Sequence, residues 1–312
     1  MTLVDGRALV GRAQAGAYAV AAFNVSNLET TQAIVSAAEA ARAPVILQLS
    51  PGALAYAGYR PLTRLVMSAA DEARIEITVH LDHCRDLAVV ERALGDGFGS
   101  VMFDGSALSD EENAATTARV VGLARAASAA GSGRPPAVEG ELGRIGGSED
   151  TTLDEARAGR SSPDRCRWFV EATGIDILAP AIGSVHRMPD DSVELDLEHL
   201  AAVAAAAGTP LALHGGSGVA RDQLAGAIRA GIAKVNISSR VGGALAAGIQ
   251  AHWAAHPADR DLRRYLGRGR DSVAALASEY FELTGSVGRS GFEAPDDATP
   301  AIAGAGPAFE PE

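Results

Sequence analysis

The stretch PLALHGGSG, residues 210–218, joins an apolar run to a histidine and then to a loop of three glycines and one serine. An apolar run of this length is typical of a buried strand. Seven more runs share this character: AYAVAAFNV (17–25), PVILQLS (44–50), ITVHLD (77–82), SVMFD (100–104), AVEGELG (137–143), IDILAPAI (175–182) and IAKVNIS (232–238). The sequence therefore predicts eight buried strands.

Alanine-rich segments with apolar residues three and four positions apart separate these runs, as in helices that cross over a parallel sheet. Examples are LETTQAIVSAAEAARA (28–43), LTRLVMSAADEARI (62–75), DLAVVERALGDG (86–97) and DLEHLAAVAAAAG (196–208). Eight strand-helix units predict an α/β fold, a (β/α)8 TIM barrel, with a doubly wound open sheet as the alternative. We expect one barrel domain over residues 1–285 and a flexible tail, rich in Pro, Gly, Ala and acidic residues, over 286–312.

Composition narrows the class of protein. The chain has 312 residues and a formal net charge of −12, which argues against nucleic acid as a partner because no basic surface is available to neutralise phosphates. Two cysteines are too few for a disulfide framework, and no apolar run is long enough to span a membrane. The first residues lack the apolar core of a signal peptide, so we expect a cytoplasmic enzyme.

Three histidines follow predicted strands at their carboxyl ends: His83, His186 and His214. These ends meet on one rim of a barrel, so the three imidazoles are expected to be neighbours. Three protein ligands with one open coordination position are typical of catalytic zinc. The remaining histidines fall inside a predicted strand or helix and are interpreted as structural or solvated: His80, His199, His252 and His256.

Acidic residues accompany the predicted metal site. Asp82 directly precedes His83, and Glu139 and Glu141 alternate along VEGELG. Glu149 lies with Asp150 in GRIGGSED, which is either an ordinary solvated loop or a loop that swings over the rim. A divalent metal beside one fixed and one mobile acid is equipped to move protons at a polarised carbonyl.

An ordered series of motifs resembles the class II, zinc-dependent fructose-bisphosphate and tagatose-bisphosphate aldolases. The motifs are AFNVSN (22–27), VILQLS (45–50), HLDH (80–83), EGELGRIGGSED (139–150), DILAPAIGSVH (176–186), PLALHGGSGV (210–219) and KVNIS (234–238). The resemblance covers about residues 5–285. It implies a TIM barrel enzyme of carbohydrate metabolism and glycolysis that cleaves a phosphorylated ketose reversibly into a dihydroxyacetone-phosphate-like donor and an aldehyde.

The resemblance also assigns roles to residues. It implies zinc on His83, His186 and His214, with Glu141 holding the metal in an alternative position. Asp82 resembles the acid that protonates the aldehyde oxygen, and Glu149 resembles the base that takes the donor proton. The substrate and its phosphate are implied to contact Asn24, Ser50, Arg187, Gly215, Gly216, Ser217, Asn236, Ser238 and Ser239. It further implies a monovalent cation near the phosphate, a homodimer or homotetramer, and a place beside the glycine loop for Lys234, the only lysine.

The sequence departs from the family pattern on the phosphate side. Arg187 and Met188 follow the second zinc histidine, where the family has glycine, and Arg240 replaces an acid in NISSR. Arg187 either binds the anionic group of the substrate, blocks the usual phosphate position, or points into solvent. The alternatives for function are therefore a zinc enzyme with a different, specialised carbonyl substrate, or a non-catalytic barrel that binds sugar phosphates.

Overall fold

A computed structural model describes residues 3–130, 135–143, 159–184 and 193–291. Within them, parallel strands pair in sequence order and close into a barrel, with β1 also paired to β8. The strands are β1 (Val20–Asn24), β2 (Val45–Leu49), β3 (Ile77–Cys84), β4 (Ser100–Phe103), β5 (Ala137–Leu142), β6 (Ile177–Pro180), β7 (Leu211–Leu213) and β8 (Ile232–Ile237). The prediction of a (β/α)8 TIM barrel is confirmed, and the open sheet is wrong because β1 and β8 pair.

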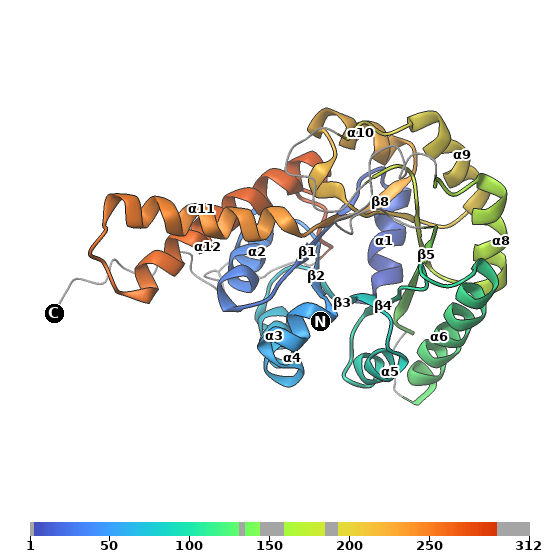
Figure 1. Cartoon of the computed structure of the whole chain (residues 1–312), viewed down its shortest axis with the longest axis horizontal. Helices are drawn as coiled ribbons and strands as arrows, with labels where there is room; N and C mark the ends of the chain where they lie inside the picture. Colours follow the sequence, from blue (N-terminus) through green and yellow to red (C-terminus); the bar gives the residue numbers. More distant parts are fainter. Residues whose placement is uncertain (1–2, 131–134, 144–158, 185–192, 292–312) are drawn as a thin grey trace.

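Helices surround the barrel (Figure 1). They are α1 (Gly6–Ala15), α2 (Leu28–Ala41), α3 (Pro51–Ala57), α4 (Tyr59–Glu72), α5 (Leu87–Gly95), α6 (Asp110–Ala130), α8 (Pro163–Thr173), α9 (Leu197–Ala207), α10 (Arg221–Arg229), α11 (Ser239–Ala255) and α12 (Leu262–Leu283). Several begin where a side-chain oxygen accepts a backbone N–H of the first turn, as Asp86 does for α5 and Asp196 for α9.

The amino-terminal mouth of the barrel is closed by α1. The segment before this helix pairs with the first residues of β3, since Val4 N–H donates to Ile77 O at 2.9 Å. Leu9 and Val10 of α1 are fully buried against small residues inside the barrel. Those small residues are mostly alanines: Ala22, Ala137, Ala179, Ala212 and Ala233. Alanine on the inner face leaves room for the α1 side chains, so this end of the barrel is a packed apolar core.

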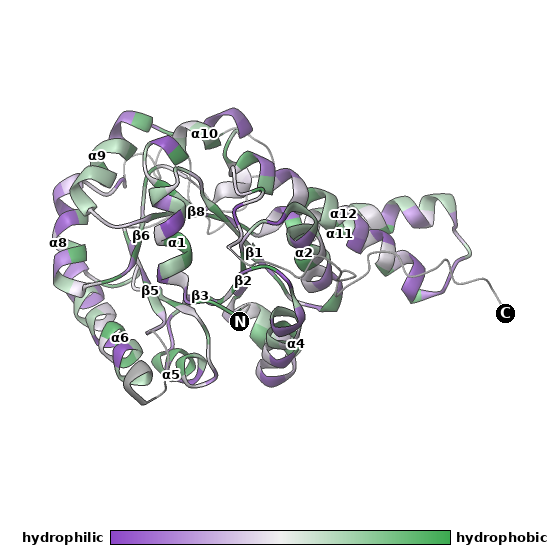
Figure 2. Cartoon of the chain, turned by 180° about the vertical axis from the view of Figure 1, so that it is seen from behind, coloured by the Kyte–Doolittle hydropathy of each residue, from purple (hydrophilic) through white to green (hydrophobic). Residues whose placement is uncertain are grey.

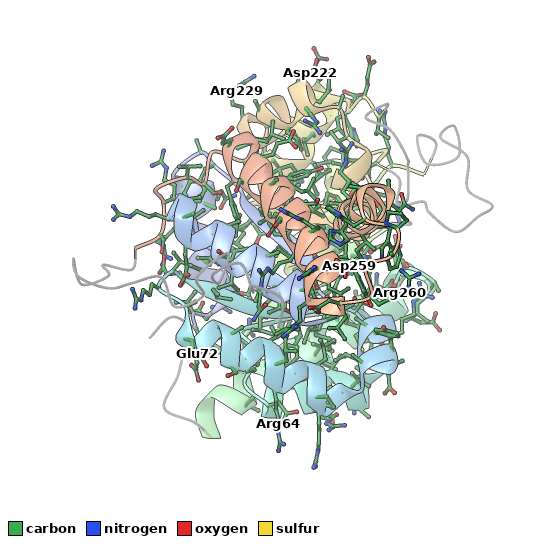
Figure 3. The ribbon with its side chains drawn as sticks, turned by 90° about the vertical axis from the view of Figure 1, so that its left-hand side faces the viewer. Arg64, Glu72, Asp222, Arg229, Asp259 and Arg260 are labelled. Atoms are coloured by element: carbon green, nitrogen blue, oxygen red, sulfur yellow. The ribbon has the colours of Figure 1, made fainter. Side chains whose placement is uncertain are left out.

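A second, larger core lies between the strands and the outer helices, where strand residues such as Val79 and Leu213 are fully buried. Figure 2 shows helices with mixed hydrophobic and hydrophilic residues around hydrophobic strands, as expected of helices with one buried face. Figure 3 shows charged side chains such as Arg64 on α4 and Asp222 on α10 pointing away from the molecule. Among the described residues, no helix combines the length and apolar character needed to cross a membrane.

Two irregularities in strand pairing change which side chains face the barrel interior. Along β3, Leu81 pairs with Val101 and Cys84 with Phe103, so β3 carries one extra residue at Asp82–His83. Along β8, an extra residue between Ile232 and Lys234 shifts the pairing with β7. A β-bulge of this kind interrupts the alternation of side chains across the sheet. Each bulge therefore allows two consecutive residues to face inward.

At the carboxyl-terminal side, α11 and α12 pack along each other and extend away from the barrel (Figure 1). Beyond α12, Gly288 N–H donates to Ala41 O at 2.9 Å and Ser290 N–H to Arg42 O at 3.0 Å, which holds residues 286–291 against the end of α2. Residues 292–312 lie outside the described residues. The domain limit at 285 and the flexible tail stay predictions.

Candidate active site

A cavity of about 510 Å³ opens at the carboxyl ends of the strands. Its lining residues come from β1, β2, β3, β7 and β8 or from the loops that follow them: Asn24, Ser50, Asp82, His83, Arg85, Gly215, Ser217, Asn236, Ser238 and Ser239. This is the rim on which TIM-barrel enzymes carry their active sites. Nine of the predicted site residues therefore line one cavity, although they come from distant parts of the sequence.

The backbone at the end of β3 is strained where it presents His83. This residue has φ of 47°, in the left-handed region that residues other than glycine seldom adopt. It coincides with the bulge, so Asp82 and His83 both approach the cavity while Cys84 returns to the apolar layer between strand and helix. Strain of this kind persists where surrounding structure imposes it, and it gathers at functional sites.

Asp82 is a buried carboxylate held from one side. Asn24 Nδ2 donates to Oδ2 of Asp82 at 2.8 Å, and Gln48 Nε2 donates to Oδ1 of Asn24 at 3.1 Å. The other oxygen, Asp82 Oδ1, has no hydrogen-bond partner among the described residues. Burial raises the pKa of Asp82, but the nearby imidazoles of His83 and His214 outweigh burial and lower the pKa to about 2. Asp82 is therefore a charged carboxylate that lines the cavity, with one oxygen available as a hydrogen-bond acceptor.

His83 and His214 turn ring nitrogens toward each other, with His214 Nδ1 2.9 Å from His83 Nε2. Together with Asp82 they form a group whose ligand atoms lie within 4.8 Å of one another. Burial lowers the pKa of His83, but Asp82, Asp104 and Glu141 outweigh it and raise the pKa to about 9. The surroundings thus favour positive charge at this point. Two imidazoles beside the Asp82 carboxylate suit a zinc-like divalent cation.

His83 also belongs to a second group of possible ligands, with Asp104 and Glu141. Its Nδ1 lies 3.5 Å from Glu141 Oε2 and 3.8 Å from Asp104 Oδ2. Asp104 already accepts from Arg85 Nε at 2.9 Å and from the Ser106 hydroxyl at 2.6 Å. Its carboxylate is engaged with these donors, so the first group offers a metal the more available oxygen.

The glycine loop at the end of β7 is a buried turn against β8. Gly215 has φ of 67° and leads into a 3-10 turn over Gly216–Gly218. A side chain at Gly216 would meet Val235 Cγ1 at 2.8 Å and Asn236 O at 2.9 Å, so only glycine fits this close approach. A left-handed residue followed by a helical turn is a backbone arrangement typical of anion-binding concavities.

Arg240 is tied to the same loop from α11. Its Nε donates to Ser217 O at 2.7 Å, while the Ser217 hydroxyl accepts the N–H of Ser238 at 3.3 Å. The substitution of an acid by Arg240 therefore braces the glycine loop and adds a positive charge next to it. The hydrogen bond explains how an arginine is accommodated at this position.

The structure brings together some predicted residues and is silent on others. The metal ligand His186, the base Glu149 with its neighbour Asp150, and Arg187 lie outside the described residues. His80 is confirmed as a residue inside its strand, with Nδ1 2.8 Å from Ser100 Oγ. The placement of Lys234 beside the glycine loop is wrong. It is fully buried in the barrel interior, where Nζ lies 2.9 Å from Glu139 Oε2.

The sequence reasoning assigned no role to Arg85 or Asp104 and indicated Glu139 only as an acid near the metal site, although all three contact the site or line it. Asp104 could have been found, because it directly follows an apolar run just as His214 does. Arg85 follows His83 by two positions, but nothing in a single sequence indicates that its side chain borders the cavity.

The chain matches a known protein family over nearly its whole length. The family profile described as Fructose-bisphosphate aldolase class-II matches residues 4–289. The chain belongs to this family. A fructose-bisphosphate aldolase of Thermus caldophilus is 38% identical over 312 residues, covering 92% of this chain and 100% of that protein. A sulfofructosephosphate aldolase of Alkalicoccus urumqiensis is 35% identical, covering 93% of this chain and 99% of that protein.

The fold comparison agrees with the family. The crystal structure of the YdjI aldolase from Escherichia coli K12 superposes with a TM-score of 0.80 at 30% identity, covering 92% of this chain and 99% of that one. The chain is therefore a class II aldolase, a lyase of the metal-dependent type. The resemblance inferred from its motifs is confirmed.

Proposed function

We propose that the chain is a zinc-dependent aldolase that cleaves a phosphorylated ketose into a dihydroxyacetone-phosphate-like donor and an aldehyde. One observation carries the proposal: the Asp82 carboxylate, His83 and the glycine loop line one cavity, and His214 Nδ1 lies 2.9 Å from His83 Nε2. His83 and His214, with His186, would hold the metal, and Glu141 would offer an alternative ligand. Zinc would polarise the substrate carbonyl and stabilise negative charge on its oxygen.

The glycine loop would bind the donor phosphate. Backbone N–H groups of Gly215, Gly216 and Ser217 provide partial positive charge without a basic side chain, and the hydroxyls of Ser238 and Ser239 line the same cavity. Ser50 and Asn236 border the space between this loop and Asp82. A ketose fixed by its phosphate would have its carbonyl group near the two histidines.

Asp82 would move the proton at the aldehyde oxygen. In the cleavage direction its carboxylate accepts the proton from the substrate hydroxyl as the carbon-carbon bond breaks, and in condensation it returns that proton. Asn24 donates to Oδ2, and Oδ1, which has no hydrogen-bond partner among the described residues, would exchange the proton. Glu149 would exchange the second proton at the donor carbon.

The proposal also includes a homodimer or homotetramer in the cytoplasm, with a monovalent cation at the phosphate. Arg187 and Arg240 would adjust phosphate recognition, since Arg240 already braces Ser217. The relatives are named for fructose-bisphosphate and for sulfofructosephosphate, and both names denote a phosphorylated ketose.

A coupled assay for triose phosphate release tests the proposal directly. The substrates would be fructose 1,6-bisphosphate, tagatose 1,6-bisphosphate, fructose 1-phosphate and sulfofructose phosphate. We expect cleavage of at least one of them by the wild-type enzyme and a loss of about 100-fold or more in Asp82→Asn. Tight binding of these compounds without turnover of any would support a binding protein instead.

A further inference from the structure

A chain of buried polar contacts runs beneath the proposed metal site. Lys234 Nζ lies 2.9 Å from Glu139 Oε2, and Glu139 Oε1 lies 2.7 Å from His214 Nε2. His80 Nε2 lies 3.9 Å from the same Glu139 carboxylate. The side chains of Lys234, Glu139, His80 and His214 have no solvent-exposed surface. The contacts thus connect β8, β5 and the end of β7 inside the barrel.

Stability alone gives little reason for this ion pair. Removing two charges from water costs several kcal/mol per ion, and apolar residues of similar volume often replace a buried pair without loss of stability. The barrel interior next to it is built from alanines and α1 side chains, so apolar packing is the local alternative. The bulge in β8 is what brings Lys234 inward beside Ala233. An ion pair that requires both a strand bulge and two buried charges indicates a role at the metal site that it contacts through His214.

The partners of His214 define which ring nitrogen carries the proton. Glu139 places its second oxygen, Oε2, 2.9 Å from the Lys234 ammonium, and an ion pair of this kind keeps the side chain in its carboxylate form. A carboxylate only accepts, so His214 Nε2 must donate to it. The other nitrogen, Nδ1, then carries a lone pair, and it faces His83 Nε2 at 2.9 Å. Asn236 Nδ2 lies 3.2 Å from His214 Nε2 and 3.4 Å from His214 Nδ1. Both distances are longer than the 2.7 Å contact with Glu139, so Glu139 determines which nitrogen carries the proton.

We propose that Glu139 and Lys234 are positioning residues that fix the tautomer and the ring orientation of His214, so that its Nδ1 is presented to the metal. Glu139 accepts the hydrogen bond from His214 Nε2–H, and Lys234 pairs with the second oxygen of Glu139 so that the carboxylate cannot turn away. A carboxylate behind a histidine ligand commonly changes metal affinity by about 10- to 100-fold. This inference rests on the metal site of the proposed function.

Glu139→Gln tests this positioning role, because the single oxygen of the glutamine must then accept from both Lys234 and His214. The Lys234 ammonium, as the charged donor, is expected to take the glutamine oxygen. The glutamine NH2 then faces His214 Nε2 and donates to it, which moves the ring proton to Nδ1 and blocks the metal. We expect zinc affinity, measured by competition with a chromophoric chelator, to fall about 10- to 100-fold.

Adding Lys234→Met to Glu139→Gln supplies the rescue. Without the ammonium, the glutamine oxygen is free to accept from His214 again, so the double variant should bind zinc more tightly than Glu139→Gln alone. A purely structural pair predicts the opposite, because the double variant disturbs more of the core. Asp176→Asn is the matched control. Like Glu139, Asp176 is an acid paired with a basic residue, here Arg7, and it accepts the backbone N–H of Val138 at 2.9 Å, but it lies just before β6. Its zinc affinity should stay that of the wild type.

Nitrogen-15 NMR of the wild-type enzyme with labelled histidine tests the same point without a variant at Glu139. We expect His214, assigned by its loss in His214→Asn, to carry its proton on Nε2 with and without zinc. A proton on Nδ1 would overturn the inference, as would unchanged zinc affinity in Glu139→Gln. Wild-type protein that binds no zinc would instead contradict the proposed metal site, and with it this inference.

Discussion

The two ends of the barrel interior use the same strands for opposite purposes. At the amino-terminal mouth, α1 fills the barrel with Leu9 and Val10 against alanines, and every one of these side chains is fully buried. At the carboxyl-terminal mouth, polar residues border a cavity of about 510 Å³, among them Asp82, His83 and the amides Asn24 and Asn236. The difference shows that one end provides stability while the other places polar groups that apolar packing would exclude.

The largest loss of activity is expected for substitution of Asp82. Asp82→Asn keeps the side chain's size and its place beside Asn24, but it removes the charged oxygen that would exchange the proton. We expect kcat for ketose cleavage to fall about 100- to 10,000-fold, as for loss of a general acid-base group. Chemical unfolding should show little loss of stability. A variant that keeps full activity would show that another group moves this proton.

At the opposite end, Leu9→Ala should reverse this pattern. The substitution leaves a void between α1 and the inner faces of the strands, where Leu9 has no exposed surface. We expect a loss of about 2–5 kcal/mol in the free energy of unfolding in urea, with kcat and KM of the folded protein unchanged. A large change in kcat without a change in stability would contradict the division between the two ends.

These two ends also differ in how far the sequence could predict them. The eight apolar runs were sufficient to predict the barrel, because strands buried on both faces have a continuous apolar pattern. Asp82 and His214 could be found because polar residues at strand ends break that pattern. The inward position of His83 and Lys234 depends on bulges, which a single sequence does not reveal. Lys234 therefore lies buried in the barrel interior and not at its predicted position beside the glycine loop.

Gly216→Ala tests the glycine loop, with a smaller expected effect. An added methyl group would meet Val235 Cγ1 at 2.8 Å and Asn236 O at 2.9 Å, and the loop must move away from β8. Overpacking of this kind costs about 1–3 kcal/mol, so we expect KM for the phosphorylated ketose to rise about tenfold. Gly11→Ala in α1 is the control, because among the described residues its added methyl group meets nothing within 4 Å beyond its chain neighbours and its own helix backbone. Equal KM values in both variants would argue against phosphate binding by the loop.

Arg85→Gln should have the smallest effect. Arg85 lines the cavity, but its side chain is 63% exposed and its guanidinium is paired with Asp104 at 2.8 Å. Exposed ion pairs contribute about 0.2–1 kcal/mol, so we expect kcat/KM to change about fivefold or less. The steady-state rates would be compared with those of Arg119→Gln, an exposed arginine on α6. A loss of a hundredfold would instead place Arg85 among the groups that bind substrate.

The most direct test of the central claim removes the metal from the wild-type enzyme. The protein would be treated with a chelator, its zinc content verified by mass spectrometry, and its cleavage of the best ketose phosphate measured before and after zinc is restored. The arrangement of His83, His214 and Asp82 around one point predicts loss of activity in the metal-free protein and recovery with one zinc ion per chain. Full activity in protein verified to be free of metal would contradict the account.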